Sequence, residues 1–220
     1  MRPVVIERCP TPRGEIQLQQ RGQEHEIISN GVFLSSSADG PSNRVLVRVA
    51  LDACAHEPRR LLIGGLGVGA TLAEAAAQTA LERIVVVEIE DAVIRWTRTH
   101  LAPHSADAHS DPRVELVHAD LVGWLPHADE VFDAVCLDID NGPDWTVTDD
   151  NTGLYTHEGL TAVRRLVAPG GAIAVWAAHQ SPAFVERFRG YVADVMEVSV
   201  PVPRGEPDRI YVGQVSPGRS

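Results

Sequence analysis

A glycine-rich turn followed by a strand-end acid is the chemically most informative part of the sequence. Residues 60–71 read RLLIGGLGVGAT, and residues 84–90 read IVVVEIE. Glycines let a backbone approach a ligand closely, and the N-terminus of a following helix offers unpaired N–H groups. Glu88 lies about 20 residues beyond the turn, where an acid can accept hydrogen bonds from ribose hydroxyls. This order predicts a nucleoside pocket, and its spacing fits either NAD or S-adenosylmethionine.

Two further acids, Asp120 and Asp138, each follow an apolar run of the kind that forms a buried strand. Ligands of parallel α/β sheets bind at the carboxyl ends of the strands, so we expect both acids to meet Glu88 and the glycine turn 64–69 there. A lone carboxylate at an apolar strand end is costly to bury, which favours a functional role for Asp138. Asp120 has an alternative role as the cap of a short helix that begins at Leu121.

Strands and helices alternate from residue 59 onward, which predicts an α/β, doubly wound, mostly parallel Rossmann-like sheet. The last two strands are expected to close it as an antiparallel hairpin. Residues 14–36 alternate in polarity and turn at Asn30-Gly31, which predicts a small N-terminal β-meander. The expected strands of the main sheet are 61–63, 84–87, 114–117, 132–138, 172–177, 195–200 and 210–215, and the expected helices are 43–55, 70–80, 91–101, 156–167 and one from Ser181.

These elements divide the chain into three parts. We expect the β-meander over residues 1–40, an S-adenosylmethionine-binding methyltransferase-like domain over residues 41–215, and a loose tail over residues 216–220. The last few residues of a domain are often poorly ordered, which favours a loose tail here.

Composition and charge argue against several classes of protein. The formal net charge of −11 opposes a nucleic-acid partner, because a duplex would repel this surface. No apolar run approaches the roughly 20 residues of a membrane span, and the N-terminus lacks the apolar core of a signal peptide. The three cysteines are scattered and odd in number, which fits a cytoplasmic protein. The nine histidines match no zinc spacing, so we expect no metal.

The quoted segments resemble the spermidine synthase family of aminopropyltransferases, within the class I S-adenosylmethionine-dependent methyltransferase fold. That fold ends in an antiparallel hairpin, whereas NAD-binding domains usually continue in parallel. The resemblance runs from about Gly14 to Trp176, and its best-matching pieces are 61–65, 87–94, 111–114, 119–120, 132–138, 142–143, 154–155 and 169–171.

The resemblance implies a role for each strand end. Glu88, with Ile89 beside it, would bind the ribose, while Asp120 and the Leu121 N–H would bind the adenine. Asp138 would orient and deprotonate the attacking amine. The resemblance also implies that the meander forms a homodimer contact. The turn glycines that would approach S-adenosylmethionine, or its decarboxylated form, are Gly64, Gly65, Gly67 and Gly69.

Both halves of the site depart from the family pattern. Gly67 stands where the family usually carries the Asp that holds the amine of the decarboxylated donor's aminopropyl arm. An acid-free turn suits the carboxylate of ordinary S-adenosylmethionine instead. In the amine-substrate motif Asp39 survives, but Asn43 and Arg44 replace Tyr and His, and Arg44 would repel a polyamine.

Substrate contacts are expected in the segment after Asp138. Asn141 replaces the family's usual acid three residues on, and Asp140 is expected to assist Asp138 in its place, or else to form a turn. The polar loop 144–155 lies above the sheet edge where substrates bind. The substrate-contact candidates are Asp39, Asn141, Trp145, Asn151 and Tyr155. The alternative for the two aromatic residues is that they pack the loop itself.

The sequence therefore predicts a cytoplasmic, S-adenosylmethionine-dependent transferase that acts on a small molecule, with methyl transfer favoured and Asp138 as the base. Aminopropyl transfer from decarboxylated S-adenosylmethionine, which makes a polyamine, is the alternative within enzymes. A non-catalytic nucleoside-binding protein is a third hypothesis, which an obstructed pocket beside Asp138 would support.

Overall fold

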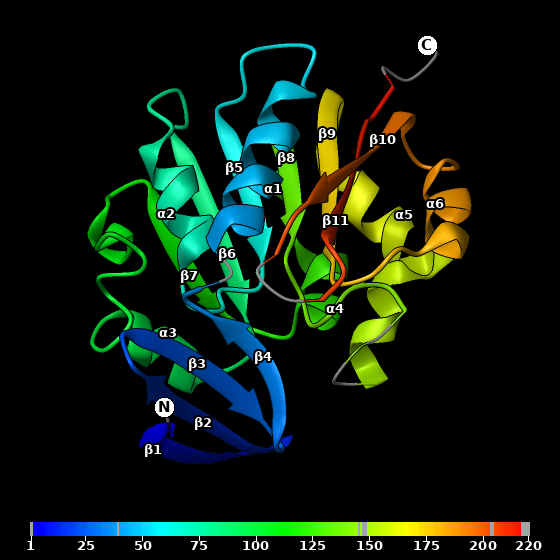
Figure 1. Ribbon diagram of the computed structural model, residues 1–220. Helices are drawn as coiled ribbons and strands as arrows, with labels where there is room; N and C mark the ends of the chain where they lie inside the picture. Colours follow the sequence, from blue (N-terminus) through cyan, green and yellow to red (C-terminus); the bar gives the residue numbers. More distant parts are fainter. Residues whose placement is uncertain (1, 39, 145, 147–148, 203–204, 217–220) are drawn as a thin grey trace.

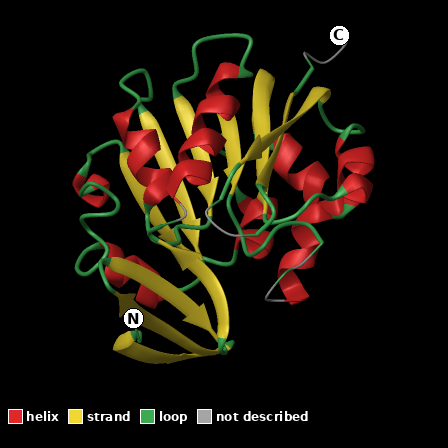
Figure 2. Ribbon diagram, viewed as in Figure 1, coloured by secondary structure: helices red, strands yellow, loops and turns green. Residues whose placement is uncertain are grey.

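Two sheets form the framework of the protein in the computed structural model, which describes residues 2–38, 40–144, 146, 149–202 and 205–216 (Figures 1 and 2). The smaller sheet has four antiparallel strands in sequential order. The larger has seven strands in the order β10-β11-β9-β8-β5-β6-β7. The strands of the smaller sheet are β1 (Val4–Thr11), β2 (Gly14–Arg21), β3 (Glu24–Ser29) and β4 (Val32–Ser36).

The larger sheet is parallel except at one edge. Strands β5 to β9 pair in parallel, whereas β11 runs antiparallel to both β9 and β10. Its strands are β5 (Arg60–Gly64), β6 (Arg83–Glu88), β7 (Val114–His118), β8 (Phe132–Leu137), β9 (Val167–Ala177), β10 (Ala193–Val200) and β11 (Asp208–Gln214). This arrangement confirms the predicted doubly wound sheet with a closing hairpin. The chain leaves β5 toward β6 on one side and reaches β8 on the other, which makes the end of β5 a topological switch point.

Helices cover both faces of this sheet because its strands bury alternate side chains on opposite faces. Leu61 and Ile63 pack toward α1, α2 and α3, while Leu62 packs toward α4, α5 and α6. The helices are α1 (Gly40–Asp52), α2 (Ala70–Ala77), α3 (Asp91–Thr97), α4 (Leu121–Trp124), α5 (His157–Arg165) and α6 (Pro182–Phe188). Short 3₁₀ turns are η1 (Ala108–Ser110), η2 (Leu125–His127) and η3 (Asp149–Tyr155). No helix in the described ranges is long and apolar enough to cross a membrane.

The meander contains one strand more than the sequence predicted. Strand β1 carries Pro10 and lies between Pro3 and Pro12, and prolines oppose assignment to a sheet interior. β1 is an edge strand that pairs with β2 alone, so its prolines remove no hydrogen bond that a second neighbour would need. The meander lies across the carboxyl ends of the parallel strands (Figure 1).

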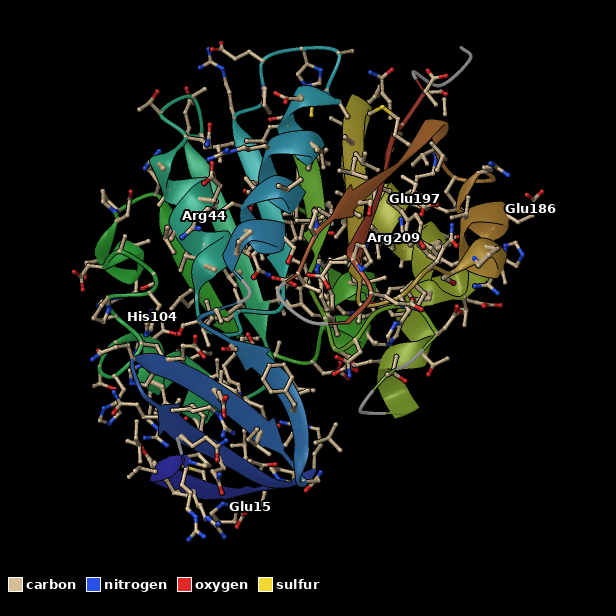
Figure 3. The ribbon with its side chains drawn as sticks, in the orientation of Figure 1. Glu15, Arg44, His104, Glu186, Glu197 and Arg209 are labelled. Carbon is tan, nitrogen blue, oxygen red and sulfur yellow. The ribbon has the colours of Figure 1, made fainter. Side chains whose placement is uncertain are left out.

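A half-buried pair of histidines joins the meander to the larger sheet. His25 Nδ1 of β3 lies 2.8 Å from Nε2 of His104, which lies in the segment between α3 and β7. Figure 3 labels His104. Burial lowers the pKa of both imidazoles, which keeps the pair neutral so that one ring donates to the other.

Arg113 closes the C-terminal end of α2. Its guanidinium donates to the carbonyl oxygens of Gln78 and Leu81 at 2.9 Å each and to that of Ala76 at 2.6 Å. Asp111 accepts from the same group at 2.6 Å and fixes its orientation. In the described ranges the carbonyls of Ala76 and Leu81 accept from no other group and that of Gln78 accepts only from Leu81 N at 3.3 Å, so Arg113 satisfies them and complements the negative end of the helix.

We predict that Arg113→Met lowers the free energy of unfolding by about 2 kcal/mol, because Met keeps part of the apolar stem but removes a hydrogen bond from each of the three carbonyls. Urea denaturation measures this. The control is Arg98→Met, at an exposed arginine with no side-chain hydrogen bond in the described part of the chain, which should change stability by less than about 0.5 kcal/mol. Equal costs for the two variants would contradict the role of Arg113.

Candidate active site

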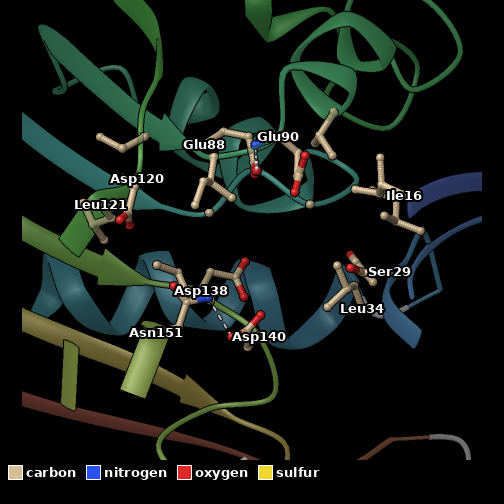
Figure 4. Close-up of a pocket in the computed structure, with 18 of the residues that line it drawn as sticks. Ile16, Ser29, Leu34, Glu88, Glu90, Asp120, Leu121, Asp138, Asp140 and Asn151 are labelled. Atoms are coloured by element: carbon tan, nitrogen blue, oxygen red, sulfur yellow. Dashed lines mark hydrogen bonds between the residues drawn. The ribbon is translucent and has the colours of Figure 1, made fainter. Parts of the chain in front are cut away.

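A cleft opens between the carboxyl ends of the parallel strands and the meander (Figure 4). It contains about 1020 Å³ of empty space, including its open mouth. Figure 4 shows Glu88 and Glu90 on one wall, Asp138 and Asp140 on the other, Asp120 and Leu121 at one end, and Ile16, Ser29 and Leu34 of the meander at the other. The strand-end acids that the sequence singled out therefore open onto one cavity.

The glycine turn is held between two strand ends by its backbone. Gly65 N donates to Val87 O at 2.9 Å, and Asp138 N donates to Gly64 O at 2.8 Å. Gly65 has a φ of 90°, and a Cβ there would lie 2.2 Å from Asp138 O. Glycine is therefore required at this position, both by its conformation and by the close approach of the two chains.

Glu88 ends β6 and is buried beneath the turn. Its Oε2 accepts from Leu66 N at 2.9 Å, and its Oε1 accepts from Glu90 N at 2.8 Å. Burial raises the pKa of this carboxyl, and the backbone hydrogen bonds oppose that rise. Each carboxylate oxygen has a second lone pair, so Glu88 can hold the turn and still accept from a ligand hydroxyl.

Asp120 lies at the start of α4, where the sequence offered it a role as a helix cap. Its Oδ1 accepts from Val122 N at 3.1 Å and caps α4, and its side chain also lines the cleft. Leu121 lies beside it and packs against Gly64, where a Cβ would meet Leu121 Cδ2 at 2.6 Å. Asp120 and Leu121 therefore bound one end of the cavity.

Asp138 follows β8 directly and receives two side-chain hydrogen bonds. Asn43 Nδ2 of α1 and Thr71 Oγ1 of α2 lie 2.7 Å and 2.5 Å from Asp138 Oδ2. Burial raises the pKa of Asp138 to about 6, although both hydrogen bonds oppose the rise. A carboxyl group that titrates close to neutral pH is suited to act as a general base.

Asp140 and Asn151 meet on the same wall of the cleft. Asn151 Nδ2 donates to Asp140 Oδ2 at 2.7 Å, and Asp140 has a φ of 51°, a conformation that Asp tolerates better than most residues. Asn141 lies outside the lining, and its carbonyl accepts from Ala178 N at 3.1 Å.

Tyr155 lies in the core rather than in the lining of the cleft. Its hydroxyl donates to Ile139 O at 3.2 Å. Its ring packs edge-on against that of Phe184, with the two ring centroids 5.8 Å apart. The sequence offered packing of the loop itself as the alternative for Tyr155; the ring packs against α6 in the core. Gly65 and Gly67 line the cleft. Gly64 and Gly69 lie outside the lining, where they pack against Leu121 and Ser105.

Asp39 and Trp145 lie outside the described residues, and the ligand roles of the candidates remain predictions.

Several lining residues gave no signal in the sequence. Arg13 of the meander donates from Nε to Glu90 Oε1 and from Nη2 to Ile89 O, both at 2.9 Å. Trp176 of β9 also lines the cavity, and so does Asn43 of α1, which the sequence marked only as a replacement for the family's Tyr and not as a partner of Asp138. Their partners lie far away in the chain, so no local pattern marks them.

Residues 42–200 match the family described as the spermine/spermidine synthase domain. The chain belongs to this family. The resemblance on which the sequence-based roles depend is therefore confirmed, and the match covers every strand-end acid of the cleft.

Polyamine aminopropyltransferases are among the relatives with similar sequences. The chain is 32% identical over 155 residues to polyamine aminopropyltransferase 2 of Pseudomonas aeruginosa, covering 68% of this chain and 42% of the relative. It is 32% identical over 166 residues to the polyamine aminopropyltransferase of Mycobacterium tuberculosis, covering 74% of this chain and 31% of the relative. The chain thus spans less than half the length of these curated relatives.

Solved spermidine synthases share the fold. The spermidine synthase in complex with the transition-state analogue AdoDATO superimposes with a TM-score of 0.79 at 18% identity, over 97% of this chain and 74% of that one. The spermidine synthase from Thermotoga maritima gives a TM-score of 0.78 at the same identity and coverage. At this identity the likeness establishes the fold.

We predict that Gly65→Ala destabilises the protein more than Gly22→Ala does. Both glycines have a positive φ, 90° and 67°, so both variants incur left-handed strain of about 1–2 kcal/mol. A Cβ on Gly22 would meet nothing within 4 Å, whereas one on Gly65 would collide with Asp138 O, which adds roughly 1–3 kcal/mol. Urea denaturation of both variants measures the difference, and equal costs would show that the turn and the β8 end are not in close contact.

Proposed function

We propose that this chain is an alkyl-transferring enzyme that moves the aminopropyl group of decarboxylated S-adenosylmethionine to an amine, with Asp138 as the base. The observation that carries the proposal is the opening of Glu88 and Asp138 onto one cleft in a chain of the spermine/spermidine synthase family. The aminopropyltransferase names of the relatives support this reaction over methyl transfer. The solved structure with AdoDATO supports a cleft of this fold as the place of reaction.

The charge of the cleft supports a cationic donor that lacks a carboxylate. The acidic residues that line it are Glu88, Glu90, Asp120, Asp138 and Asp140. Arg13 is the one basic residue among the described lining residues, and it is paired with Glu90. Decarboxylated S-adenosylmethionine is positively charged at its sulfonium and its amine, so it gains attraction from this excess of carboxyl groups without bringing a carboxylate to be repelled.

We assign separate tasks to the acids of the cleft. Glu88 would accept from the ribose hydroxyls and Asp120 from the adenine amino group, which fixes the adenosyl part. Asp138 would take a proton from the amine as its nitrogen forms the new bond to carbon. The carbon–sulfur bond breaks at the same step, and its electron pair stays on sulfur, which becomes a neutral thioether. Holding nitrogen, carbon and sulfur in line would supply most of the rate enhancement.

The test is turnover with both donors in parallel, with a panel of small amines and diamines as acceptors and mass spectrometry of the products. We expect methylthioadenosine from decarboxylated S-adenosylmethionine, with kcat/KM falling as the pH drops below about 6 because a protonated Asp138 cannot accept a proton. Asp138→Asn should lower kcat by roughly 100-fold or more and leave methylthioadenosine binding intact.

Asp129→Asn, at an exposed loop position, is the matched control and should retain full activity. If S-adenosylhomocysteine forms from ordinary S-adenosylmethionine, and no methylthioadenosine forms from the decarboxylated donor, the enzyme transfers a methyl group and the aminopropyl proposal is wrong. Binding of methylthioadenosine without turnover of either donor would support the non-catalytic nucleoside-binding protein.

Methyl transfer remains the second candidate because of Gly67. The family's usual acid is absent there, and a Cβ on Gly67 would lie 3.0 Å from Ser35 Oγ of the meander. The Ser35 hydroxyl and an acid-free turn at this point would suit the carboxylate of ordinary S-adenosylmethionine.

We predict that Gly67→Asp raises the preference for the decarboxylated donor. The φ of 49° at Gly67 is one that Asp tolerates, and Ser35 can rotate away. The ratio of kcat/KM for the decarboxylated donor to that for S-adenosylmethionine should rise by about tenfold or more, since a charged hydrogen bond contributes about 1.5–3 kcal/mol. Gly67→Asn has the same shape without the charge and should leave the ratio nearly unchanged. The same rise in both variants would mean that charge at this position does not select the donor.

A further inference from the structure

Two side chains from different helices converge on one oxygen of Asp138. Asn43 lies in the first turn of α1 and Thr71 in the first turn of α2, and both donate to Oδ2, at 2.7 Å and 2.5 Å. Thr71 is 1% exposed, so its hydroxyl does not exchange this partner for bulk water. The helices α1 and α2 pack against each other on the same face of the sheet, which brings the two donors together.

The two oxygens of Asp138 are therefore inequivalent. Oδ2 has both of its lone-pair directions taken by Asn43 and Thr71. Oδ1 receives no hydrogen bond from any residue that the structure describes, and Asp138 lines the cleft. A proton arriving from the cleft consequently finds its acceptor at Oδ1.

We propose that Asn43 and Thr71 are positioning residues, which occupy Oδ2 of Asp138 and thereby present Oδ1 as the atom that takes the proton of the nucleophile. The inference rests on the proposed function. In the transfer step the N–H proton passes to Oδ1 while nitrogen bonds to carbon, and the carbon–sulfur electron pair leaves with sulfur. Neither Asn43 nor Thr71 gains or loses a proton in this step.

The electrostatics of the site agree with this geometry. Burial raises the pKa of Asp138, the hydrogen bonds from Thr71 and Asn43 lower it, and the nearby Asp208 of β11 raises it again. Burial raises the pKa of Cys136 in β8 and of Tyr155 before α5; the charge of Asp138 adds to the rise for Cys136, and the charges of Asp140 and then Asp138 add to it for Tyr155. The two donors are thus the groups that favour the charged, proton-accepting form of the carboxyl.

Asn43 occupies a place that sequence comparison alone would assign to the acceptor. The resemblance aligns it with a Tyr of the amine-substrate motif, but its amide points to Asp138 in this chain. A residue that only contacted the acceptor would alter KM for the amine. A residue that positions Asp138 alters kcat and the proton affinity of the carboxyl instead.

The experiment compares Thr71→Val, which keeps the shape of the side chain and removes the hydroxyl, with Thr71→Ser, which keeps the hydroxyl. Asn43→Ala removes the second donor. Thr161→Val is the matched control, because the exposed Thr161 hydroxyl donates to His157 O on α5, away from the cleft. Carboxyl ¹³C NMR, assigned with Asp138→Asn, follows the titration of Asp138 without any turnover, and the pH dependence of kcat is measured beside it.

We expect the Asp138 titration to move upward by about one pH unit in Thr71→Val and in Asn43→Ala, which corresponds to one lost charged hydrogen bond. kcat should fall by roughly tenfold in both variants, with methylthioadenosine affinity unchanged, because the carboxyl is less well oriented. In Thr71→Ser the Asp138 titration and kcat should both stay close to those of the unmodified protein. Thr161→Val should change neither the titration nor kcat.

Two outcomes separate this inference from the proposed function. An Asp138 titration that stays in place in Thr71→Val and Asn43→Ala would overturn the positioning role, whatever the activity. A titration that moves as expected in an enzyme that turns over neither donor would support the positioning of Asp138 and overturn the transfer reaction.

Discussion

The close contact between the glycine turn and the neighbouring strand ends is the constraint on which the rest of the site depends. Gly64 accepts from Asp138 N, Gly65 donates to Val87 O, and Leu66 donates to the Glu88 carboxylate. These bonds run from β5 to both neighbouring strands, so the turn cannot move without moving a strand end. A side chain at Gly65 would break the contact. The positions of Glu88 and Asp138 relative to each other follow from this backbone geometry.

The carboxyl groups that share this cleft repel one another. Hydrogen bonds from groups beside each carboxylate offset this repulsion. Backbone N–H groups bind Glu88 and Asp120, an arginine of the meander binds Glu90, and neutral side chains bind Asp138 and Asp140. Asp138 receives neutral donors rather than a cation, so its burial is only partly offset and its pKa stays near 6. The cleft therefore keeps negative charge available for a cationic ligand.

The meander completes the cleft instead of merely flanking it. Ile16, Ile27 and Leu34 form an apolar wall opposite the strand ends, and Arg13 holds the segment that follows Glu88. Methylene groups of a ligand can pack on such a wall while its charged groups meet the acids. The family match begins at residue 42, so this wall lies outside the matched segment.

The sequence by itself determined the fold class, the closing hairpin and the acids at the strand ends, because these follow from local periodicity and from the rule that parallel strands end at one edge. It missed β1, whose prolines are tolerated only because that strand lies at an edge. The tertiary structure alone decided that Asn43 and Thr71 hold Asp138, that Arg13 joins Glu90, and that Tyr155 lies in the core. These partners are dozens of residues apart, and the packing of helices on the sheet, which no local pattern encodes, brings them within hydrogen-bonding distance.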